Sequence, residues 1–169
     1  SCSSDPVSEH PAHFPEPVRE TDSSWDKNKF ELGRKLFYEK GLSTDSSVSC
    51  GSCHIQEYAF SDTASLSAGA HGYLGFRNAQ ALMNLSYKQK FFRDGGVNSI
   101  ERATIPPMEG GFEMDLNIRE LIQRLKANPK YVSDFKEIFG DQPQHKTILA
   151  ALAYFQTSLI SADSRYDRH

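Results

Sequence analysis

The residues best suited to chemistry in this sequence form the run Cys50-Gly51-Ser52-Cys53-His54. Two cysteines one helical turn apart can form thioethers with the two vinyl groups of one porphyrin, and the histidine that follows can bind the iron. The small Gly51 and Ser52 keep the backbone close to the edge of the macrocycle. We therefore predict one covalently bound haem c at Cys50 and Cys53, with His54 as the proximal axial ligand.

Two other kinds of site fit the cysteine pair less well. A thioredoxin-like dithiol lies between a strand and a helix, and no segment here alternates convincingly over the length of a strand. A structural zinc ion needs four ligands, usually from two such pairs, so Cys2 or a distant histidine would have to complete the set. Only three cysteines are present, which excludes a disulfide scaffold.

The segment before the motif has the pattern of a helix. Residues 26–41 place apolar side chains at helical intervals, with Asp26 as the predicted N-cap and Gly41 beyond the end. Residues 42–49 then read as a turn. We expect this helix and turn to deliver the haem-binding motif.

The middle of the chain is less regular. Residues 64–77 are rich in Ser, Gly and Ala and are expected to lack regular structure, whereas residues 78–92 return to helical spacing. A short helix is predicted over 99–105, ended by Pro106 and Pro107 because proline cannot donate a backbone hydrogen bond.

Three helices are predicted in the C-terminal part, over 117–128, 128–140 and 145–161, each with an apolar stripe. The residues expected to mark their ends are Asn117 and Glu120 in a capping box, Asn128 and Pro129 at a helix start, and Gly140 at a helix end. The sequence therefore predicts an all-α fold: a flexible leader over 1–24 and one cytochrome c-like haem domain with additional helices over 25–169.

Composition narrows the class of partner. The 169 residues carry a formal charge of −3, which gives no reason to expect nucleic acid. No apolar run reaches the roughly 20 residues of a membrane-spanning helix, and any export signal is expected to be removed or left out. Cys2 is read either as an incidental thiol in the leader or as the lipid-bearing cysteine of an anchored protein. Thioether formation takes place outside the bacterial cytoplasm, so the bacterial periplasm is the expected location.

Four stretches in register resemble the bacterial di-haem cytochrome c peroxidases, the family that includes the MauG-type maturation enzymes. They are LGRKLFYEKGLSTDSSVSCGSCHIQEYAFSD, GFRNAQALMNLSYKQKFFRDGG, SIERATIPPMEGGFEM and ILAALAYFQTSLISADSRYDRH. The resemblance covers roughly residues 30–169 and concerns the N-terminal half of such enzymes, which holds the peroxide-reacting haem. It implies a peroxidase that takes electrons from a periplasmic donor such as a small cytochrome c or a cupredoxin.

The resemblance also implies roles for three residues outside the haem-binding motif. His71 matches the distal histidine that binds the iron at rest and leaves on activation, and Glu113 matches the carboxylate of the distal pocket. Asn78 falls near a position that helps to hold calcium between the two domains. Chemistry supports two of these roles. A Gly-rich loop can release an imidazole at little cost, and a carboxylate in a dry pocket can accept and return the proton that peroxide cleavage requires.

Three departures from the family pattern bear on mechanism. Arg93 stands where the family usually has a tryptophan between the haems, Ala103 stands where a glutamine accompanies the carboxylate, and no second Cys-x-x-Cys-His is present. Reduction of peroxide to water takes two electrons. One can come from the iron, so the other must come from the porphyrin, from an oxidisable side chain, or from another haem domain or chain. The sequence is thus expected to be either a piece of a di-haem enzyme or a single-haem relative. The alternative function is an electron-transfer module without peroxidase chemistry.

Overall fold

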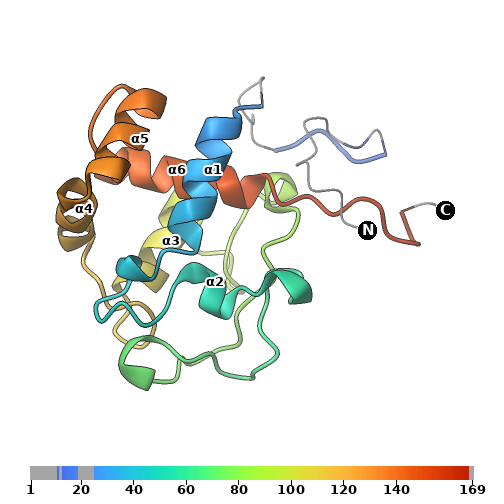
Figure 1. Ribbon diagram of the computed structural model, residues 1–169. Coiled ribbons are helices and arrows are strands. Elements are labelled where there is room, and N and C mark those ends of the chain that lie inside the picture. Colours follow the sequence, from blue (N-terminus) through green and yellow to red (C-terminus); the bar gives the residue numbers. More distant parts are fainter. Residues whose placement is uncertain (1–10, 12, 19–24, 168–169) are drawn as a thin grey trace.

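The computed structural model describes residues 11, 13–18 and 25–167 of the chain. Within these ranges the protein is helical and has no strand, only three isolated β-bridges, which confirms the all-α prediction (Figure 1). Cys2 lies outside the described residues, so its expected lipid anchor and the 1–24 leader stay predictions. The α-helices are α1 Lys27–Phe37, α2 Cys50–Cys53, α3 Ile100–Glu109, α4 Ile118–Ala127, α5 Pro129–Phe139 and α6 His145–Thr157, and the 3₁₀ helices are η1 Lys40–Leu42, η2 Gln56–Tyr58, η3 Ala70–Gly72 and η4 Leu85–Tyr87.

The crossing of α1 and α6 forms the centre of the fold (Figure 1). Gly33 makes this close approach of the two helices possible, because a Cβ at this position would overlap the carbonyl oxygen of Ala151 and the Cβ of Phe155. Around the crossing, Phe37 and Leu152 are almost fully buried in one continuous apolar core. Helices α3, α4 and α5 pack around the crossing, while α2 and the loops that follow it lie below it (Figure 1).

Several predicted helix ends are confirmed. The side chains of Asp26, Asn117 and Asn128 accept hydrogen bonds from backbone N–H groups in the first turns of α1, α4 and α5, at 2.9–3.0 Å. Gly140 ends α5 in the left-handed conformation, at φ 74°. Each of these residues satisfies backbone groups that a helix end leaves free, which is why local sequence predicted them.

Three boundary predictions are wrong. Helix α1 ends at Phe37 instead of continuing towards Gly41, which lies in η1 and donates its N–H to the Glu39 carboxylate at 2.9 Å. Glu120 pairs with Arg124 at 2.7 Å instead of closing a capping box. Helix α6 ends at Thr157, four residues short of the predicted end.

The helix predicted over 78–92 is also wrong, because long-range pairing competes with helical hydrogen bonding there. Asn84 adopts a left-handed conformation at φ 60°. Its backbone N–H donates to the Leu159 carbonyl at 2.8 Å, and its side chain exchanges two hydrogen bonds with the backbone of Ser161 at 2.8 and 3.1 Å. Only the short η4 remains of the predicted helix.

Helix α3 passes through both prolines that were predicted to end it. Pro106 and Pro107 lie near its C-terminal end, where neither can donate a hydrogen bond to the carbonyl four residues earlier. The turn is held from outside the helix: Gly110 donates to the Pro106 carbonyl at 2.8 Å, and Leu116 donates to the Met108 carbonyl at 2.8 Å. Met108 itself is 1% exposed. Burial of this end of α3 therefore outweighs the cost of the hydrogen bonds that the two prolines cannot donate.

Candidate haem site

Helix α2 presents the two cysteines on a single turn. Its start is fixed by Ser49 and Ser52: the Ser49 N–H donates to the Ser52 Oγ at 2.9 Å, and the two hydroxyl oxygens lie 3.3 Å apart. At its end, the His54 N–H donates to the Cys50 carbonyl at 2.9 Å. Cys50 and Cys53 are both free thiols, and burial raises the pKa of Cys50 to about 12. The motif is thus a rigid turn with two unpaired sulfurs.

The His54 ring is oriented by a hydrogen bond from one of its two nitrogens. Nδ1 lies 2.9 Å from the Phe60 carbonyl oxygen, so this nitrogen carries the proton, and the ring also has a hydrogen bond with the backbone of Gln80. In the neutral ring with its proton on Nδ1, Nε2 is the nitrogen that could bind a metal. Burial lowers the pKa of His54, which favours the neutral imidazole that binds a metal. A ring fixed in this way by a backbone carbonyl has the usual geometry of a metal-ligating histidine.

A cavity of about 360 Å³ opens beside this turn and is lined by both cysteines and His54. Its volume lies within the roughly 300–1,000 Å³ of small-molecule and cofactor sites. Other residues that line the cavity include the apolar Phe37, Leu82, Phe91, Phe92, Ile100, Met108 and Phe112, the charged Arg77, Lys88, Lys90, Arg93, Asp94 and Glu113, and Ala103.

Glu113 lies at this cavity, as expected for the distal carboxylate. Partial burial raises the pKa of its side chain, although the outer part stays open to solvent. The backbone around it is packed closely, because the Glu113 carbonyl accepts from the Ala70 N–H at 2.6 Å. A Cβ at Gly69 would overlap the carbonyl oxygens of Phe112 and Glu113, so only glycine allows this approach.

His71 is not among the residues that line the cavity, although its loop neighbour Gly69 is. Its backbone N–H donates to the Asp45 carboxylate at 2.8 Å. Its ring lies between two carboxylates, with Nδ1 3.7 Å from Asp45 and Nε2 3.9 Å from Asp115, and 46% of the side chain is exposed. The structure therefore does not bring His71 together with His54 and Glu113, and iron ligation by His71 stays a prediction.

Asn78 lies at the cavity wall and braces a neighbouring turn. Its amide nitrogen donates to the Asp62 carbonyl at 3.1 Å and to the Ala64 carbonyl at 2.6 Å. Over the described part of the chain, no cluster of three or more His, Cys, Asp or Glu side chains could hold a metal ion. The calcium role of Asn78 therefore stays a prediction.

Arg124 is a positioning residue that the sequence analysis missed. From α4 its guanidinium donates to the carbonyls of Gly41, Ser43 and Thr44 at 2.7–3.1 Å, which fixes the segment leading into α2. The only local signal is the i,i+4 pair with Glu120, which is typical of an ordinary surface pair. Its actual role depends on contacts with residues about 80 positions away.

These features fit a covalently bound haem. Two free thiols lie one helical turn apart, the Nδ1 of His54 is held by the Phe60 carbonyl, and a largely apolar cavity adjoins all three residues. The backbone of Gly51 lies against the Tyr38 ring, where any Cβ would overlap it, so the turn can be compact only with glycine at this position. Over the described residues no helix has the length and apolar character needed to span a bilayer.

Comparison with known proteins identifies the family. A profile of the di-haem cytochrome c peroxidase family matches residues 27–169. Cytochrome-c peroxidase IdrP1 of Pseudomonas sp. (strain SCT) is 34% identical over 88% of the chain, and the methylamine utilization protein MauG of Methylorubrum extorquens is 32% identical over 83%. The chain spans about 40% of the length of each.

Solved structures give the same result. A MauG-like protein associated with microbial copper homeostasis superposes with a TM-score of 0.80 at 33% identity, over 95% of this chain and 48% of that one. The di-haem peroxidase BthA of Burkholderia thailandensis shares the fold, with a TM-score of 0.71 at 21% identity over 83% of this chain and 41% of that one. The motif, the cavity and the family match over most of the sequence lead to one conclusion: the chain belongs to the di-haem cytochrome c peroxidase family.

Proposed function

We propose that this chain is the peroxide-reacting haem domain of a bacterial di-haem cytochrome c peroxidase. One observation carries the proposal: His54, with Nδ1 held by the Phe60 carbonyl, lines the same cavity as Glu113. An axial ligand and an acid-base group at one cavity are the minimum that peroxide cleavage requires. Residues 25–169 would form this domain, preceded by a leader.

Cys50, Cys53 and His54 would hold the haem, which would supply the iron that binds peroxide and exchanges electrons. The protein's own contribution is proton transfer. A Glu113 carboxylate oxygen accepts the proton from one oxygen of hydrogen peroxide and returns it to the other, so that the second oxygen leaves as water. The raised pKa of Glu113 supports this role, because it brings the carboxylate closer to the pH at which it must both accept and release a proton.

His71 is proposed as the sixth iron ligand at rest. His71 lies on the η3 turn at φ 57°, in the left-handed region of backbone conformation. A non-glycine residue is strained in this region, and the strain supports a loop that changes conformation because the change would release it. The position between Asp45 and Asp115 would then be that of the released histidine.

The electrons are proposed to come from a small cytochrome c or a cupredoxin in the bacterial periplasm, where thioether attachment of haem takes place. A second haem domain or chain would pass them on, in line with the di-haem family.

A second candidate function is an electron-transfer module without chemistry of its own. Ala103 and Arg93 favour it, because both line the cavity where the family pattern has a glutamine and a tryptophan. Without the glutamine, the cavity has one hydrogen-bonding group fewer with which to orient peroxide.

Glu113→Gln separates the two functions. Peroxide consumption should fall by a factor of about 10²–10⁴, the usual contribution of general acid-base catalysis, while the resting absorption spectrum is unchanged. Glu57→Gln is the matched control, because Glu57 is an exposed carboxylate in η2 away from the cavity lining. Unchanged turnover in Glu113→Gln would remove this residue from the mechanism. A low-spin spectrum that ignores peroxide in both the ferric and the ferrous form would rule out the peroxidase function for this chain and favour the electron-transfer function.

A further inference from the structure

Among the described residues that line the cavity there is no tyrosine or tryptophan, the side chains that most commonly carry a one-electron relay, and the two cysteines are assigned to the haem. Four phenylalanines line the cavity instead. Arg93, which also lines the cavity, cannot serve as a one-electron donor. An electron that reaches this site from a tyrosine or a tryptophan must therefore come from beyond the residues that line the cavity.

Tyr38 is the oxidisable side chain in direct contact with the haem-binding turn. It follows α1 directly, and its ring lies against Gly51, between the two cysteines, so closely that a Cβ on Gly51 would overlap it. Its ring also makes an edge contact with Phe37, at 5.2 Å between centroids, and Phe37 is 6.4 Å from the His54 ring. Tyr38 thus contacts the segment that carries both thioether positions and is one ring away from the axial ligand.

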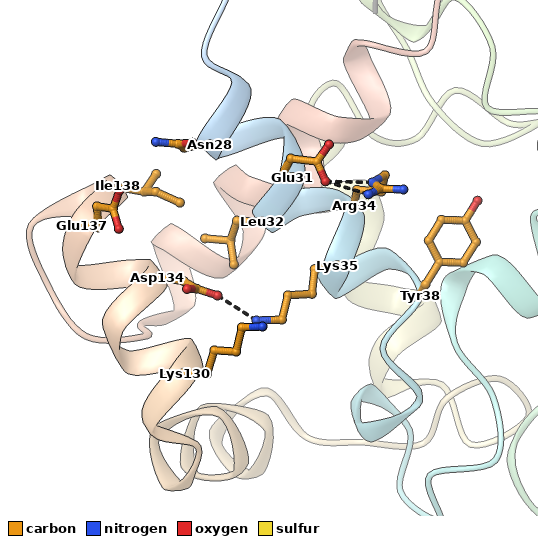
Figure 2. Close-up of a pocket in the computed structure, with 10 residues that line it drawn as sticks. All are labelled: Asn28, Glu31, Leu32, Arg34, Lys35, Tyr38, Lys130, Asp134, Glu137 and Ile138. Atoms are coloured by element: carbon orange, nitrogen blue, oxygen red, sulfur yellow. Dashed lines mark hydrogen bonds and ion pairs between the residues drawn. The ribbon is translucent and has the colours of Figure 1, made fainter. Parts of the chain in front are cut away.

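The other side of Tyr38 faces solvent. The residue is 43% exposed and lies at one edge of a surface groove between α1 and α5, apart from the Lys35–Asp134 ion pair (Figure 2). Partial burial raises the pKa of the phenol, so the group is protonated at neutral pH and must release a proton when it is oxidised. Water at the exposed edge can accept that proton.

We propose that Tyr38 is a one-electron relay between the haem site and the surface, an inference that rests on the proposed peroxidase function. Hydrogen peroxide takes up two electrons and two protons and gives two molecules of water. Tyr38 supplies one electron towards the haem: its O–H bond breaks, the proton passes to water, and a neutral phenoxyl radical remains. A one-electron donor of the cytochrome c or cupredoxin class then reduces the radical, and a proton from water restores the phenol.

Trp25 and Tyr154 form the competing route. Their rings lie 5.9 Å apart, and Trp25 reaches Phe37 only through Phe30 and Phe155, with centroid distances of 5.0, 5.3 and 5.0 Å. Phenylalanine is not oxidised under conditions that oxidise tyrosine, so two unreactive rings separate Trp25 from Phe37. Direct contact with α2 favours Tyr38.

The test traps the radical in the haem-loaded protein. The protein is treated with hydrogen peroxide in the presence of a nitroso spin trap, digested, and mapped by peptide mass spectrometry, with rapid-freeze electron paramagnetic resonance as a second measurement. We expect the adduct on Tyr38, and we expect the adduct and the radical signal to be lost in Tyr38→Phe but retained in Tyr58→Phe. Tyr58 is the matched control because it is 49% exposed and also lies close to the motif in sequence.

The outcomes separate the relay from the peroxidase function. If peroxide is consumed and the wild-type adduct lies on another residue, such as Trp25, Tyr154 or Tyr73, whose ring lies 6.1 Å from that of the cavity-lining Phe112, the relay is wrong and the peroxidase function stands. The same holds if Tyr38→Phe keeps the wild-type radical signal. If peroxide neither disappears nor changes the haem spectrum, the peroxidase function fails and the relay fails with it. The wild-type map decides even if Tyr38→Phe loads haem poorly, because it needs no variant.

Discussion

The C-terminal helices α4–α6 and the cavity wall over residues 54–99 are ordered by different means. Residues 118–157 form three helices with local caps and a continuous apolar core that includes the fully buried Phe135, Ile148 and Leu152. Residues 54–99 contain only short 3₁₀ helices, and they are held by bonds between side chains and distant backbone, such as those of Asn78 and Asn84. The helices satisfy most of their backbone hydrogen bonds internally, whereas the wall depends on particular side-chain partners.

The difference matters for function because ligands bind where local stability is low. The core side of the cavity, with Phe37 and Met108, comes from well-packed helices, while the opposite side comes from the loops. A covalently held haem would therefore bridge a stable half and a weakly ordered half. We expect the bound haem to contribute much of the stability of the wall formed by residues 54–99.

The sharpest test of this comparison removes the haem. In the double variant Cys50→Ser, Cys53→Ser, all colour should be lost on acid–acetone extraction, because no thioether remains to hold the porphyrin. Far-UV circular dichroism should still show the helices, and hydrogen exchange should accelerate over residues 54–99 but not in α6. Equal loss of protection in α6 and in the wall would contradict the division into two regions.

A smaller effect is expected where the two regions are joined. Arg124→Ala removes donors from three backbone carbonyls in the segment that leads into α2. Hydrogen bonds to charged groups contribute about 1.5–3 kcal/mol, so the free energy of unfolding should fall by about that amount in a urea titration, with faster hydrogen exchange over 41–44. Arg119→Ala, an exposed position on the same helix, is the control. Equal losses in the two variants would show that Arg124 does not join the regions.

The smallest effect concerns the pH dependence of stability. The pKa of Glu113 is raised in the folded protein above its ordinary value of 4.5 by burial. Folding therefore favours the protonated form, and the stability of the wild type falls as pH rises from about 4.5 through the raised folded pKa. In the Cys50→Ser, Cys53→Ser background, Glu113→Gln should be more stable than its parent at pH 7, and the gain should vanish below pH 4.5. Glu57→Gln is the control for the loss of one negative charge. If the gain in stability from Glu113→Gln did not depend on pH, it would contradict a raised pKa caused by burial of Glu113.

The sequence predicted what depends on neighbours along the chain. The caps at Asp26, Asn117 and Asn128 and the left-handed Gly140 are local signals, and the haem-binding motif lies within five residues. Apolar spacing over 78–92 misled the prediction, because it could not show that Asn84 pairs with Ser161, and a simple proline rule could not anticipate the burial of Met108. The contacts of Arg124 escaped detection for the same reason, since its partners are far away in sequence.

The bond from the Ala70 N–H to the Glu113 carbonyl, at 2.6 Å, links the two functional loops of the cavity. Ala70 precedes His71 directly, and Gly69 is pressed against the same backbone. A displacement of this turn would therefore also move the backbone of Glu113. If His71 and Glu113 have the roles proposed for them, release of the His71 imidazole and the position of the Glu113 carboxylate would be coupled through this one hydrogen bond.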